Sequence, residues 1–193
     1  NIEKIRDNLT KYLYKKNELK FLEQSVTKLA YILKKKKFKN LIFLNYFQKL
    51  EKFLFWLQQL IAESLGKKGK GFLPVISNAP KDHHSLLQLY LDGPKDKLFL
   101  IFHHNEKLNL NIYSDKNKKV DYLHNKSLNK IKISQKKAVI KSFKNKKIPF
   151  REFEIKKISE KTLGELFSYF ILEISITGKL AGINPFNQPA VEE

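Results

Sequence analysis

The stretch NLIFLN at residues 40–45 is a continuous apolar run framed by asparagines, and it has the length of one β-strand. Runs of this kind suit a strand that is buried on both faces of a parallel sheet. KLFLIFHH at residues 97–104 has the same character, and LPVISN at residues 73–78 is a shorter strand candidate. We expect these three runs to form the centre of one sheet.

Apolar residues with helical spacing surround the three runs. They recur at three- and four-residue steps from Phe47 to Leu65, and Gly66 is placed to end this helix. Ser159 is placed to cap a last long helix whose apolar stripe reaches Thr177. The remaining helices are expected at residues 2–16, 18–35, 84–91 and 128–143.

Two further segments have strand character. Residues 108–113 alternate between apolar and polar, which predicts a half-exposed strand or hairpin arm, and residues 148–155 are a fourth strand candidate. Strands that alternate with helices predict an α/β domain with a mostly parallel sheet between helical layers. Ligands of such sheets bind beyond the carboxyl ends of the strands.

The 193-residue chain has a formal net charge of +19, which is a property of many nucleic-acid-binding proteins. Of its 38 basic residues, however, only Arg6 and Arg151 are arginines. Surfaces that bind nucleic acid favour arginine, because its planar head makes bidentate contacts. We therefore interpret the charge as a solvated, lysine-rich surface and expect no specific nucleic-acid partner.

The composition also excludes other classes of protein. The chain contains no cysteine, so a disulfide framework and a thiolate zinc site are both impossible. It has no apolar run of the ~20 residues that cross a bilayer, and its first residues lack the pattern of a signal peptide. We expect no membrane association and a cytoplasmic location.

The segment QQLIAESLGKKGKG at residues 58–71 contains the first candidate for chemistry. Gln59 and Glu63 are four residues apart and therefore share one helix face. A carboxylate in this position is a candidate general base. The alternative is a solvated surface glutamate, and spacing alone does not decide between them. The glycines that follow fit no phosphate-binding motif and are interpreted as a basic turn.

Two histidine pairs are further candidates. His83 and His84 follow Asp82 in PKDHHS, and His103 and His104 end the third apolar run. Histidine serves as an acid–base group or as a metal ligand. No second group of ligands accompanies them at metal-site spacing, so we expect no metal ion. The alternative for each pair is an ordinary position at the edge of a loop.

Three segments, taken in order, resemble one known family. WLQQLIAESLGKKGKG at residues 56–71 resembles the segment of bacterial glucose-6-phosphate isomerases that contains the catalytic glutamate. PVISNAPKDHHSLLQLYLDGP at residues 74–94 is similar to the segment with the ring-opening histidine, and GINPFNQPAVEE at residues 182–193 is similar to the carboxyl-terminal signature. The resemblance covers most of residues 40–193 and implies a sugar isomerase (SIS) domain, in which a mostly parallel sheet lies between helices.

The resemblance also implies roles for individual residues. Glu63 matches the base that moves a proton between C1 and C2 of the sugar, and His84 matches the histidine that assists ring opening from the partner subunit of a homodimer. Gln59 and Gln188 match two glutamines that contact the substrate. The implied reaction interconverts glucose 6-phosphate and fructose 6-phosphate, in glycolysis and gluconeogenesis, with neither a metal ion nor another cofactor.

The chain departs from the family pattern in two places. The family's signature continues to a ring-opening lysine two positions beyond Glu193, and neither Arg6 nor Arg151 lies in the context of the family's active-site arginine. We therefore expect residues 1–17 to be a helix that connects to an upstream phosphate-binding domain. Residues 18–193 are expected to be a truncated carboxyl-terminal SIS domain with little activity alone.

Three other functions remain open from the sequence. The first is a non-catalytic SIS domain that binds sugar phosphates, the second is an isomerase that also accepts mannose 6-phosphate, and the third is an isomerase fused to another enzyme.

Overall fold

Four parallel strands form a sheet in the described part of this chain. The computed structural model describes residues 3, 16–35, 37–104, 110–113 and 123–191. The strands are β1 (Asn40–Asn45), β2 (Leu73–Asn78), β3 (Lys97–His103) and β4 (Phe150–Glu154). Their order is β2-β1-β3-β4, and each neighbouring pair is parallel. The predicted α/β fold with a parallel sheet is thereby confirmed.

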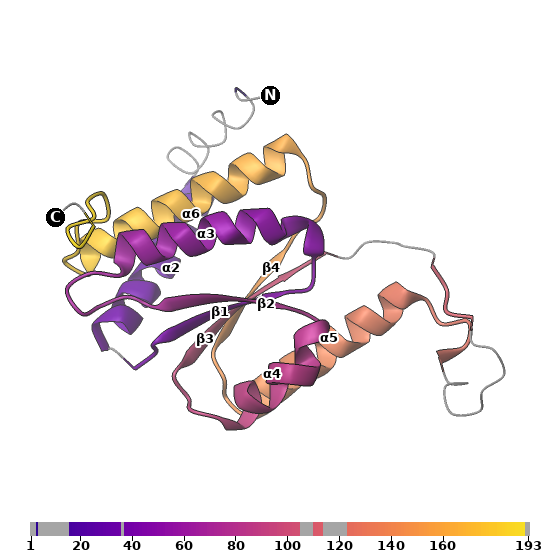
Figure 1. Cartoon of the computed structure of the whole chain (residues 1–193). Coiled ribbons are helices and arrows are strands. Elements are labelled where there is room, and N and C mark those ends of the chain that lie inside the picture. Colours follow the sequence, from indigo (N-terminus) through magenta and orange to yellow (C-terminus); the bar gives the residue numbers. More distant parts are fainter. Residues whose placement is uncertain (1–2, 4–15, 36, 105–109, 114–122, 192–193) are drawn as a thin grey trace.

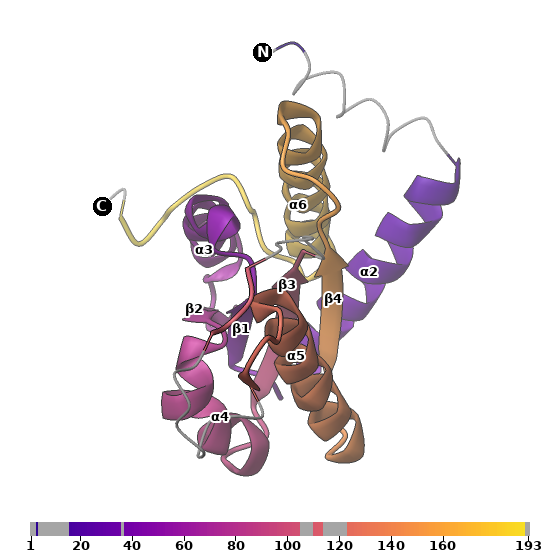
Figure 2. The same cartoon turned by 90° about the vertical axis from the view of Figure 1, so that its right-hand side faces the viewer.

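Helices cover both faces of the sheet (Figure 1). One face is covered by α2 (Lys16–Lys35), α3 (Glu51–Leu65) and α6 (Glu160–Leu180), and the other by α4 (Lys81–Asp92) and α5 (Leu128–Asn145). Figure 2 shows the same separation after a quarter turn. The sheet is therefore the middle of three layers. None of the described helices is long and apolar enough to cross a membrane.

The side chains of β1 show why residues 41–44, between its two asparagines, are all apolar. Leu41 and Phe43 pack among the apolar residues of α2, α3 and α6, whereas Ile42 and Leu44 pack among those of α4 and α5. Successive residues of a strand point to opposite faces, so a strand covered on both sides buries every residue. Phe43 is fully buried, and burial of such a side chain contributes about 1.5–3 kcal/mol.

The observed helices differ from the predicted ones mainly at their first turns. A 3-10 turn at Gln48–Leu50 precedes α3, and α4 begins at Lys81, three residues earlier than expected. The carboxylate of Asp82 accepts a hydrogen bond from the backbone N–H of Asn78 at 2.8 Å, which ties the end of β2 to the start of α4. Ser159 caps α6 as expected, since its hydroxyl accepts from the backbone N–H of Thr162 at 3.2 Å.

Two of the predicted segments lie largely or partly outside the described residues. The helix predicted at residues 2–16 lies almost wholly outside the described residues, and so do residues 108–109 of the strand predicted at 108–113. The described remainder, residues 110–113, forms an isolated antiparallel bridge between Asn111 and Ser127 and not a regular strand. Three backbone hydrogen bonds join residues 110 and 112 to residues 125, 126 and 128, and no regular ladder forms between these described segments.

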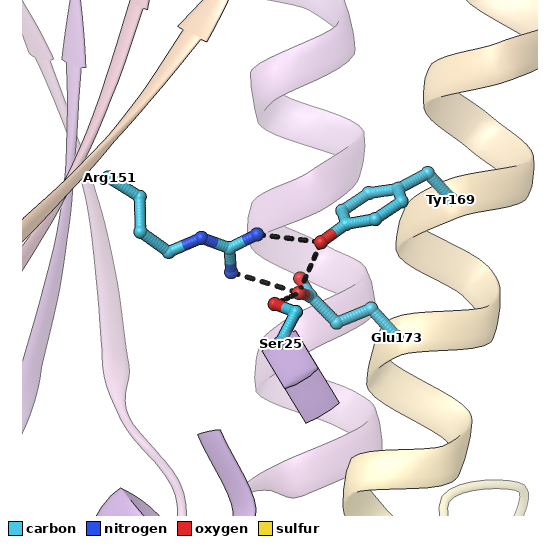
Figure 3. Close-up of polar contacts among 4 residues, drawn as sticks. All are labelled: Ser25, Arg151, Tyr169 and Glu173. Atoms are coloured by element: carbon cyan, nitrogen blue, oxygen red, sulfur yellow. Dashed lines mark hydrogen bonds and ion pairs between the residues drawn. The ribbon is translucent and has the colours of Figure 1, made fainter. Parts of the chain in front are cut away.

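A buried polar network links α2, β4 and α6 (Figure 3). Arg151 donates to a carboxylate oxygen of Glu173 at 2.9 Å and to the hydroxyl of Tyr169 at 2.6 Å. Tyr169 donates to the same carboxylate at 2.7 Å, and Ser25 is a further donor to it. Burial lowers the pKa of Arg151, but the charge of Glu173 and the contacts to Glu173 and Tyr169 together raise the pKa above its ordinary value. Arg151 is thus a structural residue that holds the edge strand to two helices.

Candidate active site

The exposed face of α3 presents the first two candidate residues. Leu57, Ile61 and Leu65 are buried on the opposite face, where they hold the helix against the sheet. This arrangement leaves Gln59 and Glu63 exposed on neighbouring turns. The side-chain amide of Gln59 donates to Oε1 of Glu63 at 2.8 Å.

The polypeptide that follows α6 supplies the third candidate. We call residues 181–191 the tail. Within it, the amide of Gln188 donates to Oε2 of Glu63 at 3.1 Å, although the two residues are 125 positions apart in the sequence. Each carboxylate oxygen of Glu63 therefore accepts one neutral amide N–H. A pocket of about 280 Å³ adjoins this contact, between the last turn of α3 and residues 188–191.

The tail is held near α3 by close packing. Ile183 is 3% exposed, and Pro185 is also buried. A side chain at Gly178 would bring its Cβ to 3.2 Å from Pro185, so the glycine lets the tail pass close to α6. Figure 1 shows the yellow tail at the same end of the molecule as the last turn of α3.

The fourth candidate, His84, lies elsewhere in this chain. It is exposed on α4, which covers the opposite face of the sheet from α3. The structure thus brings together Gln59, Glu63 and Gln188, but it does not bring His84 to them within one chain.

The neighbouring histidine has a different environment. Nε2 of His83 lies 2.7 Å from the hydroxyl of the buried Tyr46, and the two rings make an edge contact with centroids 5.4 Å apart. Burial lowers the pKa of His83, and the charge of Asp82 acts in the opposite direction. This half-buried imidazole connects the end of β1 to the first turn of α4.

The histidines at the end of β3 also have structural surroundings. His103 is 6% exposed, and its Nε2 lies 3.3 Å from a carboxylate oxygen of Glu152. Burial and the charge of Lys136 lower the pKa of His103, although Glu152 acts against them. His104 stacks against Phe47 with ring centroids 4.8 Å apart. His103 is thus a buried residue at the end of β3, and its Nδ1 has no hydrogen-bond partner among the described residues.

The candidate site is not at the carboxyl ends of the strands, where we expected a ligand to bind. Because α3 follows β1 and runs back to the start of β2, its last turn lies on the side of the strands' amino ends. At the carboxyl ends, the amide of Asn45 donates to Asn78 at 3.1 Å, and Asn78 donates to Glu51 at 2.9 Å. These side chains hold one another in place.

The described residues contain no cluster of three or more His, Asp and Glu side chains with the geometry of a metal site. They do contain two functional candidates that the sequence did not single out, Lys67 and Lys70, whose ammonium groups contact the tail. The only signal for them in the sequence is their place in the glycine-rich turn after Glu63.

Comparisons with known proteins give one consistent result, although no protein-family model matches the chain. It is 38% identical over 154 residues to a probable glucose-6-phosphate isomerase of Methanococcus maripaludis, which covers 78% of this chain and 34% of that protein. It is 35% identical over 157 residues to the glucose-6-phosphate isomerase of Methanocaldococcus jannaschii, with 79% and 38% covered. A third such isomerase, from Mycoplasmopsis pulmonis, is 36% identical over 186 residues, with 93% and 43% covered.

Two solved structures have the same fold. A hypothetical protein of Thermus thermophilus matches 98% of this chain and 46% of its own with a TM-score of 0.80 at 24% identity. A glucose-6-phosphate isomerase from Chlamydia trachomatis matches 80% of this chain and 33% of its own with a TM-score of 0.63 at 18% identity. The chain thus spans less than half the length of each relative named here.

Proposed function

Because this chain belongs to the glucose-6-phosphate isomerase family over the part of those proteins that it matches, we propose that it forms part of an aldose–ketose isomerase. The reaction interconverts glucose 6-phosphate and fructose 6-phosphate. The observation on which the proposal chiefly rests is the pair of amides, from Gln59 and Gln188, that holds the two oxygens of Glu63.

Glu63 is the proposed base. Its carboxylate removes the proton from C2 of the open sugar, which leaves an enediolate, and the resulting carboxyl group returns the proton to C1. Neutral amide donors orient the carboxylate without cancelling its charge. Because each oxygen accepts one of these hydrogen bonds, a second lone pair on each oxygen remains available for the proton. Gln59 and Gln188 are also the proposed contacts to the substrate, since each lies beside the reacting carboxylate.

The other elements of the proposal concern the complete protein. We propose that it is a cytoplasmic homodimer of SIS-type domains, and that His84 of one subunit assists ring opening in the site of the other. The position of His84 across the sheet from Glu63 supports this division of roles. We also propose that residues 1–17 connect residues 18–193, the carboxyl-terminal domain, to an upstream domain that covers the exposed Glu63.

The substitution Glu63→Gln in the full-length protein tests the proposal. The amide keeps the shape of the side chain but accepts no proton, so we expect kcat to fall by about 10²–10⁴-fold. Binding of a sugar-phosphate inhibitor should stay within a few fold of wild type. The measurement is a coupled assay of glucose 6-phosphate formation. Glu23→Gln is the control, because Glu23 is an exposed glutamate on another helix.

Retention of most of the rate by Glu63→Gln would remove Glu63 from the role of base. Wild-type protein that binds sugar phosphates without isomerising them would instead establish the non-catalytic alternative. The observation that favours this non-catalytic alternative is the exposure of Glu63 in this chain. Mannose 6-phosphate, offered as a second substrate in the same assay, distinguishes a dual isomerase.

A further inference from the structure

The contact between Gln188 and Glu63 depends on how the tail is held. Beyond α6 the chain has no regular helix or strand among the described residues, so no ladder of backbone hydrogen bonds fixes its course. Burial of Ile183 keeps the tail near the core. Apolar burial is not directional, however, and it does not by itself set which way the following residues turn.

Two directional contacts to the tail come from the glycine-rich turn after α3. Nζ of Lys67 donates to the backbone carbonyl of Asn184 at 2.8 Å, and Nζ of Lys70 donates to the carbonyl of Ala181 at 2.7 Å. Ala181 is the residue that ends α6, so its carbonyl lies at the negative end of the helix dipole. Hydrogen bonds from a charged donor are roughly twice as strong as those between neutral groups.

The turn has a backbone shape that places both lysines beside the tail. Lys70 donates its backbone N–H to the carbonyl of Lys67 at 3.0 Å, which closes the turn. Lys68 and Gly69 both have positive φ, at 53° and 65°. The same turn begins three residues after Glu63, so Glu63 and the two lysines belong to one continuous segment.

The short stretch of tail between Asn184 and Gln188 links the lysine contacts to the position of the Gln188 amide. Gln188 lies four positions beyond Asn184, and an extended chain of that length reaches at most about 14 Å. With Asn184 held in place, the tail therefore has little freedom to carry the amide of Gln188 away from Glu63. The next turn of the tail is closed by a hydrogen bond from the N–H of Val191 to the carbonyl of Gln188, at 2.9 Å.

We propose that Lys67 and Lys70 are positioning residues of the isomerase site, which clamp the tail so that Gln188 holds the Glu63 carboxylate in its reactive orientation. This inference rests on the proposed function. The lysines act on main-chain carbonyls of the tail, whereas Gln188 is the side chain that touches the base.

Four substitutions in the full-length protein test the clamp. Lys67→Gln and Lys70→Gln each remove one charged donor, and Lys70→Arg restores one. Lys68→Gln is the matched control, because it removes the same charge from the same turn. Among the described residues, Lys68 makes no hydrogen bond to the tail. Unchanged hydrogen exchange in β1 and β3 verifies that each variant is folded.

The first readout is hydrogen exchange at the tail amides of Phe186 and Val191, which does not depend on isomerase activity. We expect exchange there to be roughly tenfold faster in Lys67→Gln and Lys70→Gln. Lys68→Gln should match wild type, and Lys70→Arg should lie closer to wild type than Lys70→Gln. Tail exchange that is unchanged in both glutamine variants would overturn the clamp, whether or not the protein proves to be an isomerase.

The second readout is the effect on kcat and on its coupling to Gln188. Lys67→Gln and Lys70→Gln should each lose roughly tenfold in kcat, with KM within about threefold of wild type. In a Gln188→Ala background the same substitutions should cause almost no further loss, since the lysines act through Gln188. Full additivity with Gln188→Ala would contradict the positioning role. Failure of the proposed function is recognised separately, by Glu63→Gln retaining its rate.

Discussion

Glu63 and Glu173 both lie in long helices, but their carboxylates have different surroundings. Glu63 is exposed and meets two neutral amides. Glu173 is 1% exposed and accepts hydrogen bonds from Arg151, Tyr169 and Ser25. The carboxylate of Glu63 thus faces solvent, whereas that of Glu173 is enclosed by protein donors. The first is suited to chemistry and the second to holding the fold.

The difference predicts that Glu173→Gln is strongly destabilising. The substitution leaves Arg151 half-buried without its counter-charge, and loss of one partner from such a pair costs about 2–4 kcal/mol. Urea unfolding followed by circular dichroism measures the free energy of unfolding. Glu23→Gln, on the exposed face of α2, should change it by less than about 0.5 kcal/mol.

The double variant Arg151→Met, Glu173→Leu separates the charge effect from loss of packing. The hydroxyls of Tyr169 and Ser25 lose their contact to Glu173 in this variant, but no unpaired charge remains, so it should be more stable than Glu173→Gln alone. A double variant that is less stable than the single one would show that the network contributes more than a compensated pair of charges.

At the scale of elements, regular segments were predictable and the tail was not. Helix α3 was evident from the apolar spacing between Phe47 and Leu65, and its end was evident from Gly66. Burial on both faces made the central strands equally clear. The tail has neither the helical nor the strand periodicity of apolar residues. Lysines contact its backbone carbonyls, and every residue has such a carbonyl, so the sequence does not reveal which residue is contacted. The resemblance predicts Gln188 as a site residue, and the structure adds its contact to Glu63 and the lysine contacts to the tail.

The turn after α3 provides a prediction at this scale. Gly71 has a φ of +110°, and an added Cβ would lie 2.8 Å from Cα of Gly66, so Gly71→Ala strains the backbone and also collides with it. At Gly69, φ is +65° and an added Cβ meets nothing within 4 Å, so only the backbone preference opposes alanine. We expect losses of about 2–4 kcal/mol for Gly71→Ala and about 1 kcal/mol for Gly69→Ala.

Thermal unfolding of the two alanine variants, measured under identical conditions, checks the order of these losses. Both substitutions add the same methyl group to the same turn, so their difference isolates the close approach of Gly71 to Gly66. Equal stabilities would mean that the turn relaxes freely and does not hold a fixed shape.

On the scale of the whole molecule, the sheet separates the two proposed catalytic residues. Glu63 lies on the α3 side and His84 on the α4 side. The sequence order of the segments could not reveal this, because β3 pairs with β1 and not with β2, and the strand order follows from packing of the whole domain. Within one chain, the two residues therefore belong to helices on opposite faces of the sheet.

This separation predicts subunit complementation in the full-length protein. Homodimers of Glu63→Gln and of His84→Gln should both be poorly active, because every site lacks one residue. In a mixed dimer, one site regains both intact residues while the other lacks both. Random reassembly of equal amounts should therefore restore about a quarter of the wild-type activity per site.

The measurement is the coupled isomerase assay after the two variants are denatured and refolded together, compared with each refolded alone. Recovery in the mixture alone supports a site shared between subunits. Activity of the mixture that equals the mean of the separate variants would place His84 outside the partner's site.

The long separation between Gln188 and Glu63 also has a consequence for how the protein is made. The two residues are 125 positions apart, so the ribosome synthesises Glu63 well before Gln188. At about 5–20 residues per second, this interval is on the order of ten seconds. The β1–α3–β2 segment is already synthesised during that time, and the Glu63 carboxylate in it lacks the hydrogen bond from Gln188. The proposed site is therefore completed late in biosynthesis, when the tail packs onto a domain that has already begun to fold.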